Sequence, residues 1–304
     1  MLPLLSVIMS IYNETHKDIS TAIKSVLDQT YSNFELIIII DNPTKYTRSD
    51  IRKLADDPRI RIYSNDRNIG LAMSMNRASE YAEGEFLVRM DADDISLPER
   101  FQKQYEYLIK HQLDLVCSWF NYIDFEGKQI NRNIRRYYDR NVEKLLPYAN
   151  TIHHPTVMMK KKVFEKSGRY RNFPCAQDYD LWLRIHEKKY KIGIVPEILL
   201  LYRIREKNTT SERRIQQYYT QVYSRMLYRE RKQSGADHYS IDNYNEFLNS
   251  RKIFDEKYVS KLLHAMDIKN SKGILYQLGL FLKYPFFRQY YNDGLRSRLF
   301  EKIL

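Results

Sequence analysis

Four short apolar segments alternate with amphipathic helical patterns in the first ninety residues, and this alternation limits the fold more than any other feature of the chain. The apolar segments have the length of buried strands and cover residues 4–9, 34–40, 60–63 and 86–90. Between the first two segments, apolar residues recur at helical spacing: Ile19, Ala22, Ile23, Val26 and Leu27. This alternation predicts an α/β fold with a doubly wound, mostly parallel central sheet.

Three aspartates, Asp91, Asp93 and Asp94, follow the fourth apolar segment directly. Carboxylates this close repel one another unless a cation or hydrogen-bond donors hold them. Because hard oxygen ligands suit Mg²⁺ or Mn²⁺, we predict that the cluster binds a divalent metal together with phosphate. The alternative is helix capping by Asp94 or Ser96, with Pro98 opening the helix. Capping explains one acid but not three.

Polar side chains also follow the first two apolar segments, at Tyr12, Asn13 and Asp41. The carboxyl ends of parallel strands meet at one sheet edge, so these groups should lie beside Asp91 and Asp93. An aromatic ring, an isolated acid and an acid cluster suit a base, a ribose and a metal-bound diphosphate. The sequence has no Walker or GxGxxG pattern, so we expect a cation to neutralise the phosphates.

The middle of the chain predicts further elements from the same kinds of pattern. We expect strands at 114–119 and 156–159, a hairpin around Gly127 between 120–125 and 128–134, and helices at 101–108, 139–149 and from 181 onward. Asp178 and Asp180 fall in the first turn of that last helix, where the helix dipole stabilises carboxylates. For Asp180 we favour this structural interpretation.

The chain carries a net charge of +12 over 304 residues, and the charge is concentrated toward the end of the sequence. Residues 211–304 hold 17 lysines and arginines against 10 acids, together with 11 of the 26 tyrosines. Two cysteines and no visible signal segment fit a reducing cytosol. We predict a basic helical C-terminal region over 211–304. An apolar stretch from 275 to 287, flanked by basic residues, lies either on an anionic membrane surface or against the catalytic domain or a second subunit.

Five motifs in order resemble the inverting family 2 glycosyltransferases of the GT-A fold, which assemble bacterial capsules and lipopolysaccharides. They are residues 6–14 (SVIMSIYNE), 34–38 (FELII), 68–72 (NIGLA), 90–96 (MDADDIS) and 176–182 (AQDYDLW). The fourth is similar to the family's DxD element, and the fifth to its base motif. The resemblance covers roughly residues 3–210 and implies a catalytic domain over 1–210, a nucleotide-sugar donor, commonly a UDP-sugar, and Mn²⁺ or Mg²⁺ as cofactor.

Carried over by position, the resemblance assigns roles to individual residues. Asp178 would be the general base, Tyr12 would line the base pocket, and Asp41 would hydrogen-bond the uracil. Asp93 would bind the metal, and Asp91 would bind the metal or the ribose. The remaining residues implied to bind the nucleotide sugar are Ser10, Asn13, Glu14 and Asn68.

The chain departs from the family pattern in three places. Asn42-Pro43 follows Asp41 where relatives carry Gly-Ser, and Gln177 replaces the usual acid before the base. Arg205 stands where relatives often have a histidine ligand, so we predict that Arg203 and Arg205 clamp the diphosphate. The segment up to Thr210 would then close as a lid. His154 and Gln177 are further candidates for contact with metal or acceptor, although a lone histidine before proline is more often structural.

These observations predict an inverting glycosyltransferase that moves a sugar from a nucleotide donor to a hydroxyl of a glycan or lipid-linked acceptor. We expect it in the cytoplasm, peripherally on the inner face of the plasma membrane, and capable of forming homo-oligomers. The alternative is a non-catalytic basic module that binds membranes or nucleic acid. No nucleic-acid recognition motif appears, so we expect no nucleic-acid partner.

Overall fold

A computed structural model of the protein describes residues 2–131, 136–204 and 211–251. Its strands are β1 (Leu5–Ile11), β2 (Phe34–Ile40), β3 (Ile60–Ser64), β4 (Phe86–Asp91), β5 (Ile95–Ser96), β6 (Leu115–Ile123), β7 (Gln129–Ile130), β8 (Met158–Lys160) and β9 (Ile192–Arg203). Its α-helices are α1 (His16–Leu27), α2 (Arg48–Leu54), α3 (Leu71–Tyr81), α4 (Arg100–Lys110), α5 (Asp139–Leu145), α6 (Lys161–Lys166), α7 (Gln177–Glu187), α8 (Ser211–Ser234) and α9 (Ile241–Ser250), and η1 (His154–Thr156) is a short 3₁₀ turn.

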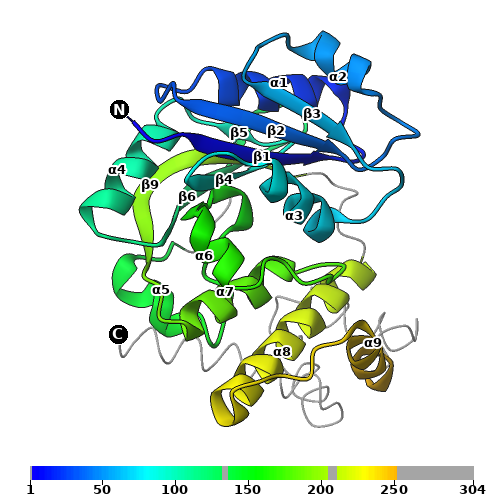
Figure 1. Ribbon diagram of the computed structural model, residues 1–304, viewed down its shortest axis with the longest axis vertical. Coiled ribbons are helices and arrows are strands. Elements are labelled where there is room, and N and C mark those ends of the chain that lie inside the picture. Colours follow the sequence, from blue (N-terminus) through cyan, green and yellow to red (C-terminus); the bar gives the residue numbers. More distant parts are fainter. Residues whose placement is uncertain (1, 132–135, 205–210, 252–304) are drawn as a thin grey trace.

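One sheet forms the centre of the molecule, with its strands in the order β3-β2-β1-β4-β8-β6-β9-β5 and β7 paired to β6 (Figure 1). The pairs β3–β2, β2–β1 and β1–β4 are parallel, as is the long β6–β9 pair. The short strands β8 and β5 are antiparallel to their neighbours. The predicted α/β fold with a mostly parallel sheet is therefore confirmed.

Helices cover both faces of this sheet, which explains why the first two strands are apolar at nearly every position. All seven residues of β1 and all seven of β2 are buried. Apolar side chains of α1, α2 and α4 join the core on one face, and those of α3, α5, α6 and α7 join the core on the other. The four predicted strands of the first ninety residues are all present.

The second half of the chain matches the predictions less closely. The segments 114–119 and 120–125 were predicted as separate strands, but they form the single strand β6, with an irregular register between Ser118 and Phe120. The twelve-residue strand β9 and the short helix α6 were not predicted. The side chains of β9 do not alternate regularly between buried and exposed positions, and so the strand pattern was not recognised. The strand is buried at its start, exposed at Pro196 and Glu197, and largely buried again beyond them.

The C-terminal helices α8 and α9 are helical as predicted, and α8 packs along α7, on the side away from the sheet (Figure 1). The predicted domain boundary at residue 210 and the predicted apolar stretch 275–287 both lie outside the described residues. The boundary and the surface that this stretch contacts therefore stay predictions. Among the described helices, none is both long enough and apolar enough for a membrane span.

Candidate active site

The carboxyl ends of β1, β2 and β4 lie side by side, and we call this edge the nucleotide edge. Ile11 pairs with Ile40, and Ser10 pairs with Asp91. The residues that follow these pairs, Tyr12 and Asp41, therefore project from neighbouring strands. The sequence-based expectation that these strand ends converge is confirmed.

The Tyr12–Glu14 loop presents an open aromatic ring at this edge. Tyr12 is 40% exposed, and its backbone N–H donates to the Glu14 carboxylate at 2.7 Å. The Lys45 ammonium donates to the Asn13 carbonyl at 2.9 Å, and the Asn42 amide donates to the Asn13 side chain at 3.1 Å. These bonds hold the loop against the segment after β2, so the tyrosine ring is available to a planar ligand.

Asp41 is buried and organises the loop that precedes α3. Its carboxylate accepts hydrogen bonds from the Asn65 side-chain amide at 2.7 Å and from the backbone N–H groups of Ile69 and Gly70 at 2.9 and 3.0 Å. Asn68 accepts a second bond from the Gly70 N–H at 2.9 Å. Gly70 has a φ of +84°, a conformation that favours glycine. Contact between Asp41 and a uracil stays a prediction, and in the structure Asp41 shapes the adjoining loop.

The acid cluster is held by two buried arginines. The Arg89 guanidinium forms an ion pair with Asp91, and Arg89 is almost fully buried whereas the Asp91 side chain is 27% exposed. Asp94 is completely buried, and one of its oxygens accepts the backbone N–H of Arg203 at 2.9 Å. Burial, with further repulsion from Asp91 and Asp93, raises the pKa of Asp94 well above that of an ordinary aspartate.

The capping alternative for this cluster is wrong. Helix α4 begins at Arg100 without a side-chain cap, Ser96 lies in strand β5, and Asp94 is bound to strand β9. Helix capping therefore does not explain the presence of the three acids. Of the three, Asp91 and Asp93 are partly exposed and could contact a ligand, whereas Asp94 is buried.

The donor set fits a divalent metal that takes most of its ligands from a substrate. Carboxylate oxygens are suitable ligands for Mg²⁺ or Mn²⁺, and Asp91 and Asp93 are both partly exposed. Within the described residues, no three His, Cys, Asp or Glu side chains are placed to enclose an ion. Asp91 and Asp93 offer two carboxylates at the nucleotide edge, and the other ligands of an ion held there would be phosphate oxygens and water.

Arg203 is engaged inside the protein. It is buried, its Nε donates to the Asp93 carbonyl at 2.8 Å, and its Nη1 donates to the carbonyls of Asp124 and Phe125 at 2.8 and 3.1 Å. This engagement disfavours the predicted clamp on a diphosphate and assigns Arg203 to holding β9 against the acid cluster. Arg205 and the predicted lid up to Thr210 lie outside the described residues.

Asp178 lies in the first turn of helix α7, as predicted, and faces the loop after α5. The Asn150 side-chain amide donates to its carboxylate at 3.0 Å. Burial raises the pKa of Asp178, although this hydrogen bond and those from the backbone work in the opposite direction. Ala176, the residue before the helix, adopts a left-handed conformation with a φ of +52°, which turns the chain sharply into α7. Gln177 is buried in the first turn.

Two adjacent histidines differ sharply in their surroundings. His154 is buried, its Nε2 lies 2.8 Å from the Tyr170 hydroxyl, and its ring packs edge-on against Trp182. This placement favours the structural interpretation of His154. His153, which we did not predict as a site residue, stacks on Phe120 with ring centroids 3.9 Å apart and lines a cavity. The paired histidines before a proline are the only sequence signal that points to it.

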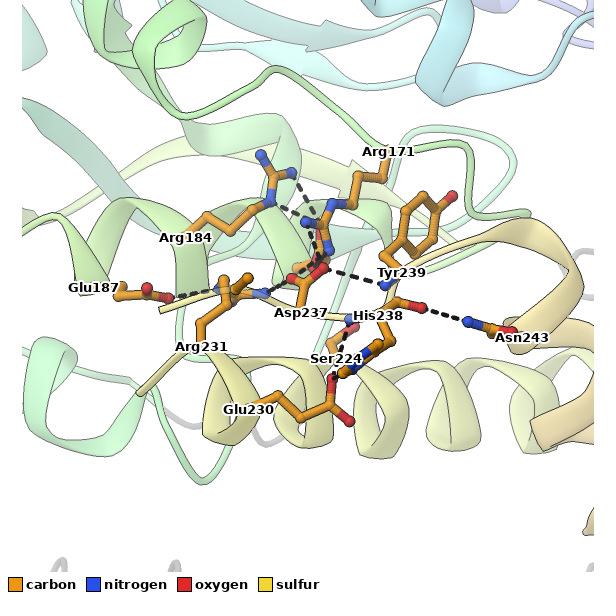
Figure 2. Close-up of polar contacts among 12 residues, drawn as sticks. Arg171, Arg184, Glu187, Ser224, Glu230, Arg231, Asp237, His238, Tyr239 and Asn243 are labelled. Atoms are coloured by element: carbon orange, nitrogen blue, oxygen red, sulfur yellow. Dashed lines mark hydrogen bonds and ion pairs between the residues drawn. The ribbon is translucent and has the colours of Figure 1, made fainter. Parts of the chain in front are cut away.

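A network of arginines and acids fixes the outer side of α7 (Figure 2). Asp180 is completely buried and forms an ion pair with Arg184 at 2.9 Å. Arg171 lies 3.6 Å from Asp180 and 2.8 Å from Asp237, the residue that Arg231 of α8 also binds. The structural interpretation of Asp180 thus involves arginine partners as well as the helix dipole. We call α7, α8 and residues 150–154 the base half of the site.

An exposed aromatic ring and an acid pair thus lie at one sheet edge, and a separate half-buried carboxylate lies at the start of α7. The chain belongs to glycosyl transferase family 2, whose family model matches residues 6–168. It is therefore a glycosyltransferase of that family, as predicted, and the non-catalytic alternative is set aside.

A named relative agrees with this family, and two solved structures share the fold. The chain is 37% identical to the Escherichia coli O-antigen biosynthesis glycosyltransferase WbnJ over 216 residues, which cover 69% of this chain and 83% of that protein. It is similar in fold to S. aureus TarS 1–349 in complex with UDP-GlcNAc, with a TM-score of 0.61, 15% identity and coverage of 91% and 79% of the two chains. It is also similar to the mannosyltransferase PcManGT from Pyrobaculum calidifontis in complex with GDP-Man and Mn²⁺, with a TM-score of 0.58, 15% identity and coverage of 97% and 85%.

Proposed function

We propose that this protein is an inverting glycosyltransferase that moves a sugar from a UDP-sugar to a hydroxyl of a glycan or lipid-linked acceptor in the assembly of a surface polysaccharide. The similarity to an O-antigen biosynthesis enzyme supports the acceptor class. The complex of TarS with UDP-GlcNAc supports a uridine donor. We place the reaction in the cytoplasm, where the two thiols stay reduced.

The observation that carries this proposal is that one short segment connects the surroundings of the two carboxylates. At one end Asn150 donates to Asp178 at 3.0 Å, and at the other the Val157 carbonyl accepts the backbone N–H of Arg89, two residues before Asp91, at 2.9 Å. Asp91 belongs to the nucleotide edge and Asp178 to the base half. A donor sugar between them would have its diphosphate on one side and a proton acceptor on the other.

In this mechanism Asp178 accepts the proton of the acceptor hydroxyl while that oxygen attacks the anomeric carbon. The bond from the anomeric carbon to the diphosphate oxygen breaks on the opposite face, and UDP leaves with the bonding electrons. Attack opposite the leaving group inverts the anomeric configuration, through a transition state with oxocarbenium character. Asn150, which donates to Asp178 at 3.0 Å, keeps the carboxylate oriented.

Asp91 and Asp93 would hold Mn²⁺ or Mg²⁺ at the nucleotide edge, and a bound ion supplies positive charge that stabilises the departing diphosphate. Arg89 orients Asp91 from the protein interior through their ion pair. Tyr12 would stack on the uracil ring, beside Asn13. Ser10, Glu14, Asp41 and Asn68 would shape the surrounding loops, since their described contacts lie within or next to those loops.

Thermal unfolding in the presence of nucleoside diphosphates tests this function. We expect UDP with Mn²⁺ to raise the Tm more than GDP, CDP, ADP or dTDP, and EDTA to remove the effect, because a ligand that binds only the folded state stabilises it. Asp93→Ala should abolish the metal-dependent rise. Asp56→Ala is the control, because the Asp56 side chain is 91% exposed. A protein that no nucleotide stabilises would contradict the proposal.

A further inference from the structure

Asp237 lies in the connection between α8 and α9, beyond the part of the chain that the family model matches. Its side chain is 5% exposed and contacts two arginines from different segments (Figure 2). Arg171, from the loop before α7, lies 2.8 Å from one carboxylate oxygen and donates to the other at 3.0 Å. Arg231 of α8 donates to the first oxygen as well. Burial acts to raise the pKa of Asp237, but the hydrogen bonds from the two arginines outweigh it and lower the pKa, so the carboxylate is charged at neutral pH.

The two arginines connect Asp237 to both ends of helix α7. Arg231 donates to the Glu187 carboxylate at 2.6 Å, and Glu187 is the last residue of the helix. Arg171 lies 3.6 Å from an oxygen of Asp180, in the first turn. One buried carboxylate outside the catalytic residues is therefore linked to the start and to the end of the helix that carries the proposed base.

The first turn of α7 is not held by a side-chain cap. Ala176, at the N-cap position, offers no side-chain hydrogen bond and adopts a left-handed conformation with a φ of +52°. Residues other than glycine adopt this conformation at an energetic cost and keep it only where the surrounding structure holds them. The contacts of the completely buried Asp180 supply such support, because its partner Arg184 also donates to the Arg169 carbonyl at 2.7 Å, in the loop before the helix.

Asp180 and the proposed base, Asp178, belong to the same turn but face different surroundings. Two positions along an α-helix correspond to a rotation of about 200°, so the two side chains leave the helix on nearly opposite sides. Asp178 faces Asn150, whereas Asp180 faces the arginines. Because both residues belong to one hydrogen-bonded turn, a movement of Asp180 toward an arginine also displaces Asp178 relative to Asn150.

The contact between Arg171 and Asp180 is incomplete. Oδ1 of Asp180 is hidden from solvent, and no described residue donates a hydrogen bond to it. Its distance of 3.6 Å from Nη1 of Arg171 is too long for a hydrogen bond, and the same guanidinium binds Asp237. An arginine released from Asp237 would close this gap, because a buried carboxylate oxygen gains from a charge-assisted hydrogen bond.

We propose that Asp237 is a positioning residue for the general base. It holds Arg171 at a distance from Asp180 and so keeps the first turn of α7, with Asp178, in the orientation that receives the acceptor hydroxyl. This inference rests on the proposed function, because the orientation of that turn affects catalysis only if Asp178 is the base. It also gives the connection between the C-terminal helices α8 and α9 a part in the reaction.

Asp237→Asn tests this role, because the amide keeps the shape of the side chain and removes its charge. We expect kcat to fall about 10- to 100-fold, since a misplacement of about 1 Å at a catalytic group has an effect of this size. UDP affinity should not change, because the nucleotide edge is built from other segments. The matched control is Asp242→Asn, five positions away, which is exposed in the first turn of α9.

The assay follows release of UDP from UDP-glucose, UDP-galactose or UDP-N-acetylglucosamine, whichever the wild type turns over, with water or a methyl glycoside as acceptor. Calorimetric titration gives the UDP affinity and the number of binding sites in each preparation. Rates are expressed per UDP site, so partial unfolding of a variant does not enter the comparison. If Asp237→Asn does not fold, the same rates are measured with trimethylamine N-oxide, an osmolyte that favours the folded state.

A second substitution distinguishes positioning from a general loss of structure. Adding Arg171→Gln to Asp237→Asn removes the guanidinium that we expect to close on Asp180. The double variant should therefore recover kcat by about three- to tenfold over Asp237→Asn alone, a coupling of the size found between residues in contact. A residue that only stabilises the fold would give a double variant no faster than the single one.

Three results would overturn the inference: a kcat of Asp237→Asn equal to that of Asp242→Asn, a loss of UDP affinity as large as the loss of kcat, or no recovery in the double variant. A wild type that neither binds UDP nor releases it from these donors would instead overturn the proposed function, as would an Asp178→Asn variant with the kcat of the wild type.

Discussion

The nucleotide edge and the base half of this site are built in different ways. At the nucleotide edge each polar group follows directly on a buried strand, and three parallel strands bring Tyr12, Asp41 and Asp91 together. In the base half, Asp178 sits on a helix that is held by contacts from distant segments. Asn150 approaches from the loop after α5, and α8 covers the other side of α7.

This difference predicts that substitutions disturb the structure of the base half more than that of the nucleotide edge. Strand pairing is repeated over many residues, so one substitution at the nucleotide edge leaves the edge in place. The base half depends on buried ion pairs that include Asp180–Arg184. Others join Asp237 to Arg171 and Arg231 (Figure 2). Removing one member of a buried ion pair leaves an uncompensated charge.

The largest effect is expected from Asp178→Asn. The amide cannot accept the proton of the acceptor hydroxyl, so we expect kcat to fall about 10²- to 10⁴-fold, the usual contribution of a general base. UDP affinity should stay unchanged, because the nucleotide edge is intact. Initial rates with a radiolabelled donor, together with calorimetric titration of UDP, measure both quantities.

Asp56→Asn serves as the control for this substitution, because Asp56 lies just beyond α2 and its side chain is exposed. Loss of UDP binding together with activity would show that Asp178 has a structural role, and the contrast between the two halves would then fail.

The next effect in size concerns stability. Asp180→Ala removes the partner of the buried Arg184, and we expect the free energy of unfolding to fall by about 3–5 kcal/mol. The matched control is Asp28→Ala, which breaks the Lys24–Asp28 pair. That pair has the same i,i+4 spacing, but its side chains are 75% and 52% exposed, so the change should be about 0–1 kcal/mol. Urea denaturation of both variants gives the comparison, and equal losses would contradict it.

The smallest effect is expected at the nucleotide edge. Tyr12→Ala removes a ring that we expect to stack on uracil, a contact that contributes about 0.5–1.5 kcal/mol. UDP affinity should therefore fall about three- to tenfold, with kcat at saturating donor unchanged. Tyr138→Ala is the control, since Tyr138 is exposed to a similar extent, at 42% against 40% for Tyr12. Calorimetric titration decides the point, and a change in kcat larger than the change in affinity would count against the stacking role.

The residues that the sequence predicted correctly and those it missed differ in the same way, by whether local motifs or distant contacts place them. Asp91, Asp93 and Asp178 were predicted as site residues because their motifs are contiguous, and the structure places these motifs at a strand end and a helix start, as expected. Arg203 was predicted to face a ligand but is buried against the acid cluster, since the strand that carries it, β9, was not recognised. His153 was missed because its stacking partner Phe120 is 33 positions away in the sequence.

The amino-acid sequence by itself determined the strand–helix alternation, the family, and the acids and aromatic ring at the nucleotide edge. These features depend on local periodicity and on motifs of a few neighbouring residues. The tertiary structure decided which of two adjacent histidines lines the cavity, what Arg203 binds, and how α8 supports α7. Those outcomes depend on burial and on pairs of charges contributed by distant segments, and neither is encoded in the spacing of residues along the chain.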